Sequence, residues 1–297
     1  MKIKNMYLNS VNKIYTDIYK NINKEYIDVF LCGGVSTNKS CIRDRVRIEL
    51  EDNKIRVLYP EDLFMDILSK NKSMDLLSLE NFLADNSDVI CIIPESPGSL
   101  VELGAFTNNE KTLENLFVVI NEKYKAQKSF IMTGPIKYIM NKKGSNRVTY
   151  YKEDLSDLIT NLKRKFKKFI KTSKNKTMDV DTIIGQYYFM QLVIYFTKYI
   201  SNKDLEKMVN YIYTNNKYEG EKFNMIFSSS LKLLYKNRYI KRDIISGKIS
   251  LTDKGNTYVE SMIYNLNIKN RGKLYDSIRY GILYSELWQD TSLENTI

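Results

Sequence analysis

The first half of the chain alternates short apolar runs with segments of helical periodicity. Residues 3–24 place apolar side chains at helical spacing and predict an amphipathic helix. Apolar runs at 27–32, 54–60, 88–94 and 116–121 predict strands, with a candidate fifth at 147–151. Strands that are apolar on both faces and alternate with helices are typical of parallel sheets. The pattern therefore predicts an α/β fold built on a parallel sheet.

Helices predominate in the second half. The most hydrophobic stretch, 183–200, contains Gln186, Gln191 and Lys198, whereas a membrane span of about 20 residues is more uniformly apolar. We therefore expect a buried helix there. Helices are predicted at 201–216 and 221–240, followed by a strand, a Ser-Gly turn, a second strand and a closing helix.

The order of helix, helix and short hairpin resembles a winged helix-turn-helix, and the letters LTDKG after the hairpin recur in that family. In such folds the second helix enters the major groove and the wing contacts phosphates. The resemblance places candidate nucleic-acid contacts on that helix and on the wing: Ser228, Ser229, Ser230, Lys232 and Lys236 on the helix, and Lys241, Arg242 and Lys248 on the wing. Winged helices also dock proteins, so both kinds of partner stay open.

Positive charge is concentrated in the second half. Residues 1–150 hold 21 Lys and Arg against 19 Asp and Glu, whereas residues 151–297 hold 25 against 16. A localised positive field suits a polyphosphate partner, although a solvated lysine-rich surface is the plain alternative. Segment 161–176 has eight basic residues and no acid, which adds as candidate contacts Lys163, Arg164, Lys167 and Lys168.

These patterns predict a division of the chain into three parts. We expect an α/β domain at 1–160, a basic helix end and linker at 161–178, and a mainly helical region at 179–297. The winged helix-turn-helix would occupy about 201–264 of that region.

The residue types available restrict the chemistry. The chain has no histidine, which excludes Ser-His-Asp and Cys-His catalysis and histidine-ligated zinc. We expect neither a metal nor a cofactor. Cys32, Cys41 and Cys91 lack CxxC spacing and are expected to be buried free thiols in a reducing cytoplasm. The first 20 residues lack an apolar signal-peptide core, so a cytoplasmic location is expected.

The sharpest chemical signal is the segment IIPESPGSLVELGAF at 92–106, which leads from a strand through a Pro-Gly turn into a helix. We take Ser99 as the N-cap, which puts Glu102 in the first turn, where the helix dipole favours a negative charge. Phosphate could bind the same free amides, which include those of Gly98 and Ser99. The alternative is purely structural, because Ser99 and Glu102 also fit a capping box.

Further polar groups gather at the predicted strand ends. Gly33 and Gly34 follow the first strand and allow a ligand to approach the backbone closely. Glu61 and Asp62 follow the second strand, and Glu80 lies on the helix that leads to the third. Such acids could bind the hydroxyl groups of a sugar, because ligands of parallel sheets bind at the carboxyl ends of the strands.

The paired glycines and the ELG helix turn resemble the nucleoside 2-deoxyribosyltransferase superfamily, which implies a Rossmann-like sheet. The resemblance implies that Glu102 is the nucleophile that attacks the anomeric carbon. It also assigns site roles to Glu80, eight positions before Asp88, and to Glu95 as the acid that contacts the sugar. The family has a tyrosine on the first strand that orients the nucleophile, but Phe30 stands there and cannot hydrogen-bond a carboxylate.

The blocks FLCGG, YPEDLF, LLSLEN and ESPGSLVELGAFTNNE, followed by a basic winged-helix region, resemble the effector proteins of type II retrons. This resemblance covers most of the chain. It implies an anti-phage defence toxin that cleaves the N-glycosidic bond of a nucleotide such as NAD. It further implies a complex with a reverse transcriptase and multicopy single-stranded DNA that holds the toxin in check, and a homo-oligomer or higher assembly.

The chemistry of N-glycoside cleavage fits a site made of carboxylates. A carboxylate below the sugar stabilises or traps the oxocarbenium-like state, and a second carboxylate close by would repel it and raise one of the two pKa values. Two other hypotheses stay open: a non-enzymatic nucleotide sensor whose winged helix regulates transcription, and a scaffold that only binds structured nucleic acid.

Overall fold

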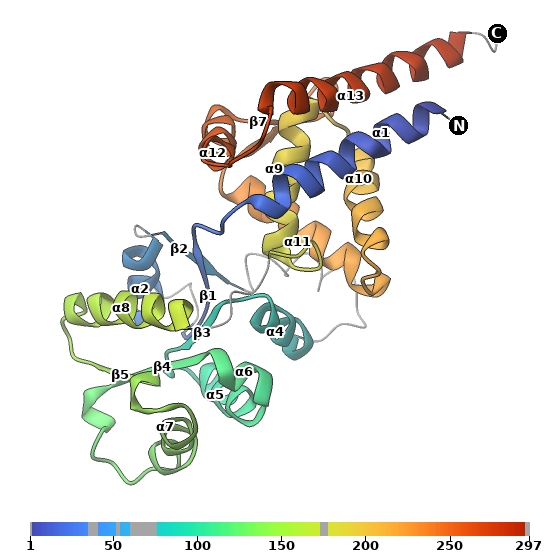
Figure 1. The fold of residues 1–297 in the computed structure, drawn as a ribbon. Helices are drawn as coiled ribbons and strands as arrows, with labels where there is room; N and C mark the ends of the chain where they lie inside the picture. The colour runs from blue at the N-terminus through green and yellow to red at the C-terminus, as the bar shows by residue number, and fades with distance from the viewer. Residues whose placement is uncertain (1, 35–40, 52–53, 60–75, 173–177, 295–297) are drawn as a thin grey trace. The chain divides into compact units, whose positions relative to one another are not determined.

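The computed structural model describes residues 2–34, 41–51, 54–59, 76–172 and 178–294 (Figure 1). The chain forms two compact units, an α/β unit of Lys24–Thr177 and a helical unit that joins Met1–Asn23 to Met178–Ile297. The α/β unit is thus inserted into the helical unit, with one chain connection at each of its ends. This division differs from the expected one at the N-terminus, because the opening helix belongs to the helical unit.

Five parallel strands form the sheet of the α/β unit, in agreement with the apolar runs. They are β1 (Ile27–Cys32), β2 (Ile55–Leu58), β3 (Val89–Ile92), β4 (Leu116–Asn121) and β5 (Val148–Tyr151), in the order β2-β1-β3-β4-β5. Because β2 and β3 lie on opposite sides of β1, the strand order reverses between β1 and β3. The loops after these two strands diverge, and open α/β sheets bind ligands in the crevice formed at such a reversal.

Helices cover both faces of this sheet (Figure 1). They are α2 (Ile42–Glu51), α4 (Leu76–Asp85), α5 (Pro97–Asn108), α6 (Glu110–Asn115), α7 (Lys137–Lys143) and α8 (Ser156–Thr172). Short helical turns occupy Glu122–Tyr124, Met132–Ile136 and Ser145–Arg147.

We expected a helix end and linker at 161–178; residues 161–172 form the second half of α8, and residues 173–177 lie outside the described residues. Leu162 and Phe166 are fully buried in the core on one sheet face, where Phe166 packs edge-to-face on Phe117 with ring centres 5.2 Å apart. The lysines lie on the other sides of the helix, so its strongly apolar stripe is hard to recognise in the sequence. Helix α8 therefore completes the α/β unit.

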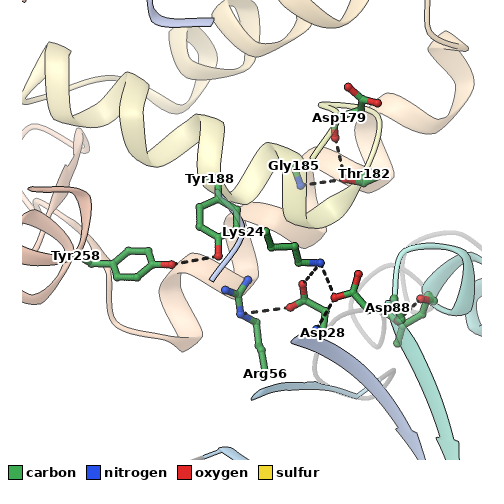
Figure 2. Close-up of polar contacts among 11 residues, drawn as sticks. Lys24, Asp28, Arg56, Asp88, Asp179, Thr182, Gly185, Tyr188 and Tyr258 are labelled. Atoms are coloured by element: carbon green, nitrogen blue, oxygen red, sulfur yellow. Dashed lines mark hydrogen bonds and ion pairs between the residues drawn. The ribbon is translucent and has the colours of Figure 1, made fainter. Parts of the chain in front are cut away.

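A cluster of buried charges ties the amino ends of β1, β2 and β3 together (Figure 2). Lys24 Nζ lies 2.6 Å from Oδ2 of both Asp28 and Asp88, and Arg56 Nε lies 3.6 Å from Oδ1 of Asp28. Asp88 also accepts the backbone N–H of Asp28 at 2.8 Å. Burial lowers the pKa of Lys24, but the two carboxylates outweigh burial and raise it, so the ammonium stays charged at neutral pH.

The helical unit surrounds the apolar helix α9 (Ile183–Thr197). Its other elements are α1 (Lys2–Lys13), α10 (Asn202–Asn215), α11 (Phe223–Lys236), β6 (Ile240–Arg242), β7 (Ile249–Leu251), α12 (Asp253–Tyr264) and α13 (Arg271–Glu294), with short turns at Ile14–Ile18, Tyr19–Asn21 and Gly220–Lys222. Helices α1 and α13 run side by side (Figure 1). Helix α9 is buried along almost its whole length, as expected, and its glutamines donate to backbone carbonyls of Val180 and Tyr187.

Among the described residues, no helix combines the length and apolar character that crossing a membrane requires. The Tyr258 and Tyr188 hydroxyls lie 3.2 Å apart, and Thr182 caps α9 by accepting the Gly185 N–H (Figure 2). The apolar character of α9 therefore serves the core of the helical unit.

We expect Asp28→Ala to lower the free energy of opening of the sheet by about 3 kcal/mol, because it leaves Lys24 and Arg56 with less compensation in a buried setting. Hydrogen–deuterium exchange of peptides from β1, β2 and β3 measures this change. Lys152→Ala is the control, since it removes an exposed partner of Glu122 in the same unit and should cost less than about 1 kcal/mol. Equal exchange in the two variants would contradict the structural role of the cluster.

Candidate functional site

The carboxyl ends of β1 and β3 lie side by side at the reversal of strand order. The backbone continues this pairing one residue beyond β3, because Ile93 N–H donates to Cys32 O at 2.9 Å. Gly33 and Gly34 follow β1, and Glu95 follows β3, so these three predicted residues are neighbours. The two loops that bound the crevice are therefore joined at their bases.

Glu95 connects these loops through its carboxylate. Oε1 accepts the backbone N–H groups of Gly34 and Arg43, both at 3.0 Å, and Oε2 accepts that of Ile42 at 2.8 Å. Ile42 and Arg43 open helix α2, whose free amides and dipole favour a carboxylate. The glycines allow the backbone after β1 to approach the Glu95 side chain closely, since a Cβ on Gly34 would lie 3.2 Å from Glu95 Cγ. A contact of Glu95 with sugar stays a prediction.

Helix α5 begins one turn earlier than the sequence analysis expected. Ser96 is the N-cap: its side chain accepts the Ser99 N–H, and Ser99 Oγ in return accepts the Ser96 N–H at 3.0 Å. Pro97 then takes the first helical position, where its missing N–H leaves no hydrogen bond unmade. The placement of Ser99 as N-cap was wrong. The Ser99–Glu102 capping box was wrong too, because two serines form the box.

Glu102 therefore lies in the second turn of α5, where it contacts the end of β1. The Cys32 thiol hydrogen-bonds Glu102 and lies close to Glu80 of α4. Burial and the charges of Glu102 and Glu80 raise the pKa of Cys32 well above its ordinary value. Glu80 is 8% exposed, and the charges of two carboxylates from separate helices therefore both act on one buried thiol.

A second contact fixes α5 against β1. Phe30 and Phe106 pack edge-to-face with ring centres 5.9 Å apart, and both are fully buried. Phe30 and Cys32 share one face of β1, while Glu102 and Phe106 share one face of α5. The aromatic pair therefore sets the position of the helix turn that carries Glu102. Phe30 thus acts on this turn by packing, whereas a tyrosine at the same position would hydrogen-bond.

The remaining predicted substrate contacts lie in different settings. Ser99 is buried, and its N–H and hydroxyl are both used in the cap. Gly98 is exposed beside it. Glu61 and Asp62 lie outside the described residues. Among residues that the structure describes, no group of histidine, cysteine or carboxylate side chains could hold a metal ion.

Sequence reasoning missed Cys32 and Ser96 as parts of this region. The three cysteines are buried and free, as expected, but Cys32 was assigned only to the core. The alternation of Phe30 and Cys32 along β1 was the available signal, because it puts both side chains on one face. Ser96 was overlooked because Ser99 with Glu102 matched a more familiar capping pattern.

The candidate nucleic-acid contacts are divided between the two units. Lys163, Arg164, Lys167 and Lys168 lie on α8 of the α/β unit. In the helical unit, Lys232 and Lys236 lie on α11, and Lys241, Arg242 and Lys248 are exposed on the β6–β7 hairpin. Two of the expected α11 contacts are wrong, because Ser229 and Ser230 are fully buried and Ser230 donates to Ile183 O.

The hairpin has a rigid, exposed tip. Asp243 Oδ1 accepts the Ser246 N–H and hydroxyl at 2.7 Å, and Arg242 Nε donates to Gly247 O at 3.1 Å. Gly247 adopts a φ of 66°, which favours glycine. Ile200, between α9 and α10, forms a single antiparallel bridge with Ile249 of β7.

Comparison with known proteins places this architecture in a family. A model of the STM3845 retron effector protein matches residues 39–242, about two thirds of the chain. The chain is 44% identical over 114 residues to a retron Ec86 protein of Escherichia coli, provisionally named a ribosyltransferase/DNA-binding protein. It is 34% identical over 117 residues to the retron Ec73 protein of Escherichia coli, which carries the same provisional description.

The two alignments cover 38% and 37% of this chain and 37% of each relative. The family match is much longer: it includes α2, the helices that carry Glu80 and Glu102, and the first strand of the hairpin, β6. The chain belongs to the STM3845 retron effector protein family.

Proposed function

We propose that this retron effector cleaves the N-glycosidic bond of a nucleotide such as NAD and serves as a defence toxin. One observation carries the proposal: at the carboxyl edge of the sheet the Cys32 thiol hydrogen-bonds Glu102, and the charge of Glu80 also acts on it. The position at the reversal of strand order is where such sheets bind nucleotides. The ribosyltransferase part of the relatives' names supports chemistry at a ribose carbon.

Glu102 is the residue placed below the anomeric carbon. As the bond from C1′ to the base nitrogen breaks, its electron pair goes to the base, and the carboxylate stabilises or traps the positive sugar. Nicotinamide leaves NAD as a neutral base because its cationic nitrogen accepts that pair. Water then forms the new C1′–O bond, and its proton passes to a carboxylate, a role that we propose for Glu80.

Two sets of hydrogen bonds hold this arrangement in place: a clamp, formed by the Glu95 carboxylate and the three backbone N–H groups it accepts, and the N-terminal cap of α5. Glu95 ties the loop after β1 to the start of α2, and Ser96 and Ser99 fix the start of α5. Preorganised groups of this kind need no rearrangement during the reaction. The proposal leaves the backbone amides of Gly33 and Gly98 to contact phosphate or sugar, because the Gly34 N–H is bonded to Glu95 and the Ser99 N–H to Ser96.

The helical unit supports a nucleic-acid contact. The order α9, Ile200, α10, α11, β6, β7, with Ile200 paired to the hairpin, supports the proposal of a winged helix-turn-helix. The hairpin exposes Lys241, Arg242 and Lys248. We propose that a reverse transcriptase and its multicopy single-stranded DNA engage this unit and restrain the toxin, and that the chain acts in a homo-oligomer or higher assembly in the cytoplasm.

The second candidate function is a nucleotide-sensing regulator without catalysis. The three backbone bonds of Glu95 favour it, because they use this carboxylate for structure. Incubation with NAD distinguishes the two functions. A sensor raises its melting temperature without releasing nicotinamide, whereas an enzyme releases the base.

We expect Glu102→Gln to reduce NAD cleavage by more than about a hundredfold, because the amide keeps the shape but removes the charge that stabilises the transition state. Nicotinamide release by the purified full chain, followed by chromatography, measures the loss. Glu49→Gln is the matched control, since Glu49 is an exposed acid of α2. Cleavage by the Glu102 variant at the control rate would exclude Glu102 as the reactive carboxylate.

A second substitution tests the thiol. Cys32→Val keeps the side-chain size but removes the hydrogen bond to Glu102, so we expect cleavage to fall about tenfold. Cys91→Val is the control, because Cys91 is equally buried in the adjacent strand but lies in the core on the other sheet face. Equal rates in the two variants would show that the thiol does not position Glu102.

A third test concerns the wing. Lys248→Ala should weaken duplex DNA binding and reduce the slope of log affinity against log salt by about one, because one phosphate contact is lost. Fluorescence anisotropy over a series of salt concentrations measures that slope. Lys128→Ala, at an exposed lysine of the α/β unit, provides the control. An unchanged slope in the Lys248 variant would favour a protein partner for the hairpin.

A further inference from the structure

The helical unit contains a cavity that the proposed reaction does not use. It has a volume of about 350 Å³ and is bounded by the end of α9, the hairpin strands, the start of α12 and α13. The chain turns sharply here, because Lys198 ends α9 with a φ of 62° before Ile200 pairs with Ile249. Every wall belongs to the helical unit, so the cavity is separate from the crevice that carries Glu102.

Positive charge predominates in its lining. Lys198, Lys241 and Arg279 contribute three cations, and Asp253 contributes one carboxylate. Within the described part of the chain, none of the three cations forms an ion pair. Lys198 and Lys241 are exposed, so water can compensate their charges, whereas Arg279 is partly buried, and desolvation of an uncompensated charge is costly. The arrangement therefore favours an anionic ligand.

Arg279 carries the strongest signal. Its Nε is buried and has no hydrogen-bond partner in the described structure, although buried donors are nearly always satisfied. The guanidinium carbon lies 5.9 Å from the ring centres of both Tyr195 and Phe196, within reach of a cation–π contact with each ring. A planar, preorganised guanidinium is suited to a phosphate, which accepts two of its N–H groups at once.

The rest of the lining suits a base and a sugar. Tyr195 and Tyr199 provide aromatic faces on which a base can stack. Asp253 can accept hydrogen bonds from an exocyclic amino group or from sugar hydroxyls. The volume falls within the range of small-molecule sites, and it accommodates a single nucleotide unit but not a duplex.

We propose that this cavity binds one nucleoside phosphate unit, with the phosphate on Arg279 and the lysines and the base against the tyrosines. The unit can be a free nucleotide or an unpaired residue of single-stranded nucleic acid. Because the hairpin supplies Lys241, occupation of the cavity links a nucleotide to the element proposed to contact nucleic acid.

The test uses photo-crosslinking of the full-length chain with 8-azido-AMP, followed by mass mapping of the labelled peptides. The Glu102→Gln background prevents consumption of the probe and separates this result from the proposed reaction. We expect labels on peptides that contain residues 194–199 or 250–256. AMP should compete more than tenfold better than adenosine, because the phosphate provides the main contact.

Substitution of Arg279 completes the test. Arg279→Met should lower labelling at least tenfold, and Arg279→Lys should restore part of it. Lys273→Met, at an exposed lysine of the same helix, should leave it unchanged. Circular dichroism checks that each variant folds. Labels confined to residues 24–177, or labelling of the Arg279→Met chain at the level of the unsubstituted chain, would overturn the proposal.

Competing ligands show whether the bound nucleoside phosphate comes from a free nucleotide or from single-stranded nucleic acid. Competition by AMP at concentrations similar to those of a single-stranded oligonucleotide supports a free nucleotide. Competition by the oligonucleotide at concentrations more than tenfold lower supports nucleic acid as the source. If neither competes with the label, the labelling is nonspecific and the proposal is rejected.

Discussion

The carboxylate of Glu95 is the interaction on which the crevice depends. It accepts three backbone N–H groups from the end of β1 and the start of α2, although it belongs to the loop after β3. The strand order reverses at this point, so the two loops would otherwise diverge. A charged acceptor strengthens such bonds, and the amino end of α2 adds its dipole. The path from β3 into α5, and hence the position of Glu102, is defined by this clamp.

The two edges of the sheet use pairs of acids for opposite purposes. At the amino edge, Asp28 and Asp88 share Lys24, and the charges largely compensate one another. At the carboxyl edge, Glu80 and Glu102 come close to a thiol, whose pKa they raise. Compensated acids stabilise a fold but offer little reactivity, whereas acids gathered around a poorly ionised group retain a negative field for a cationic transition state. The difference lies in the neighbours rather than in the residue type.

The sequence predicted which helices and strands form better than it predicted where they begin and end and how they contact one another. Apolar runs identified the five strands and the buried helix α9, because burial on all sides leaves a simple signal. The basic segment of α8 was expected to be a helix end that runs into a linker, and its basic letters concealed that Leu162 and Phe166 are fully buried in the core. The proximity of Glu80, Glu102 and Cys32 was only partly predictable, since it depends on the packing of Phe106 on Phe30. Local pattern also could not rank Ser96 above Ser99 as the cap, because both serines suit that position.

The insertion of the α/β unit between Asn23 and Met178 has a consequence for control of the effector. A unit joined by one linker can reorient freely, whereas a unit joined at both ends has two covalent constraints on its motion. Helix α1 packs along α13, so the first connection begins from a fixed part of the helical unit. Under the proposed function, a partner bound to the helical unit would therefore act on both ends of the α/β unit. The proposed restraint of catalysis would then require no direct contact with Glu102, only a difference in the partner's affinity for two states of these connections.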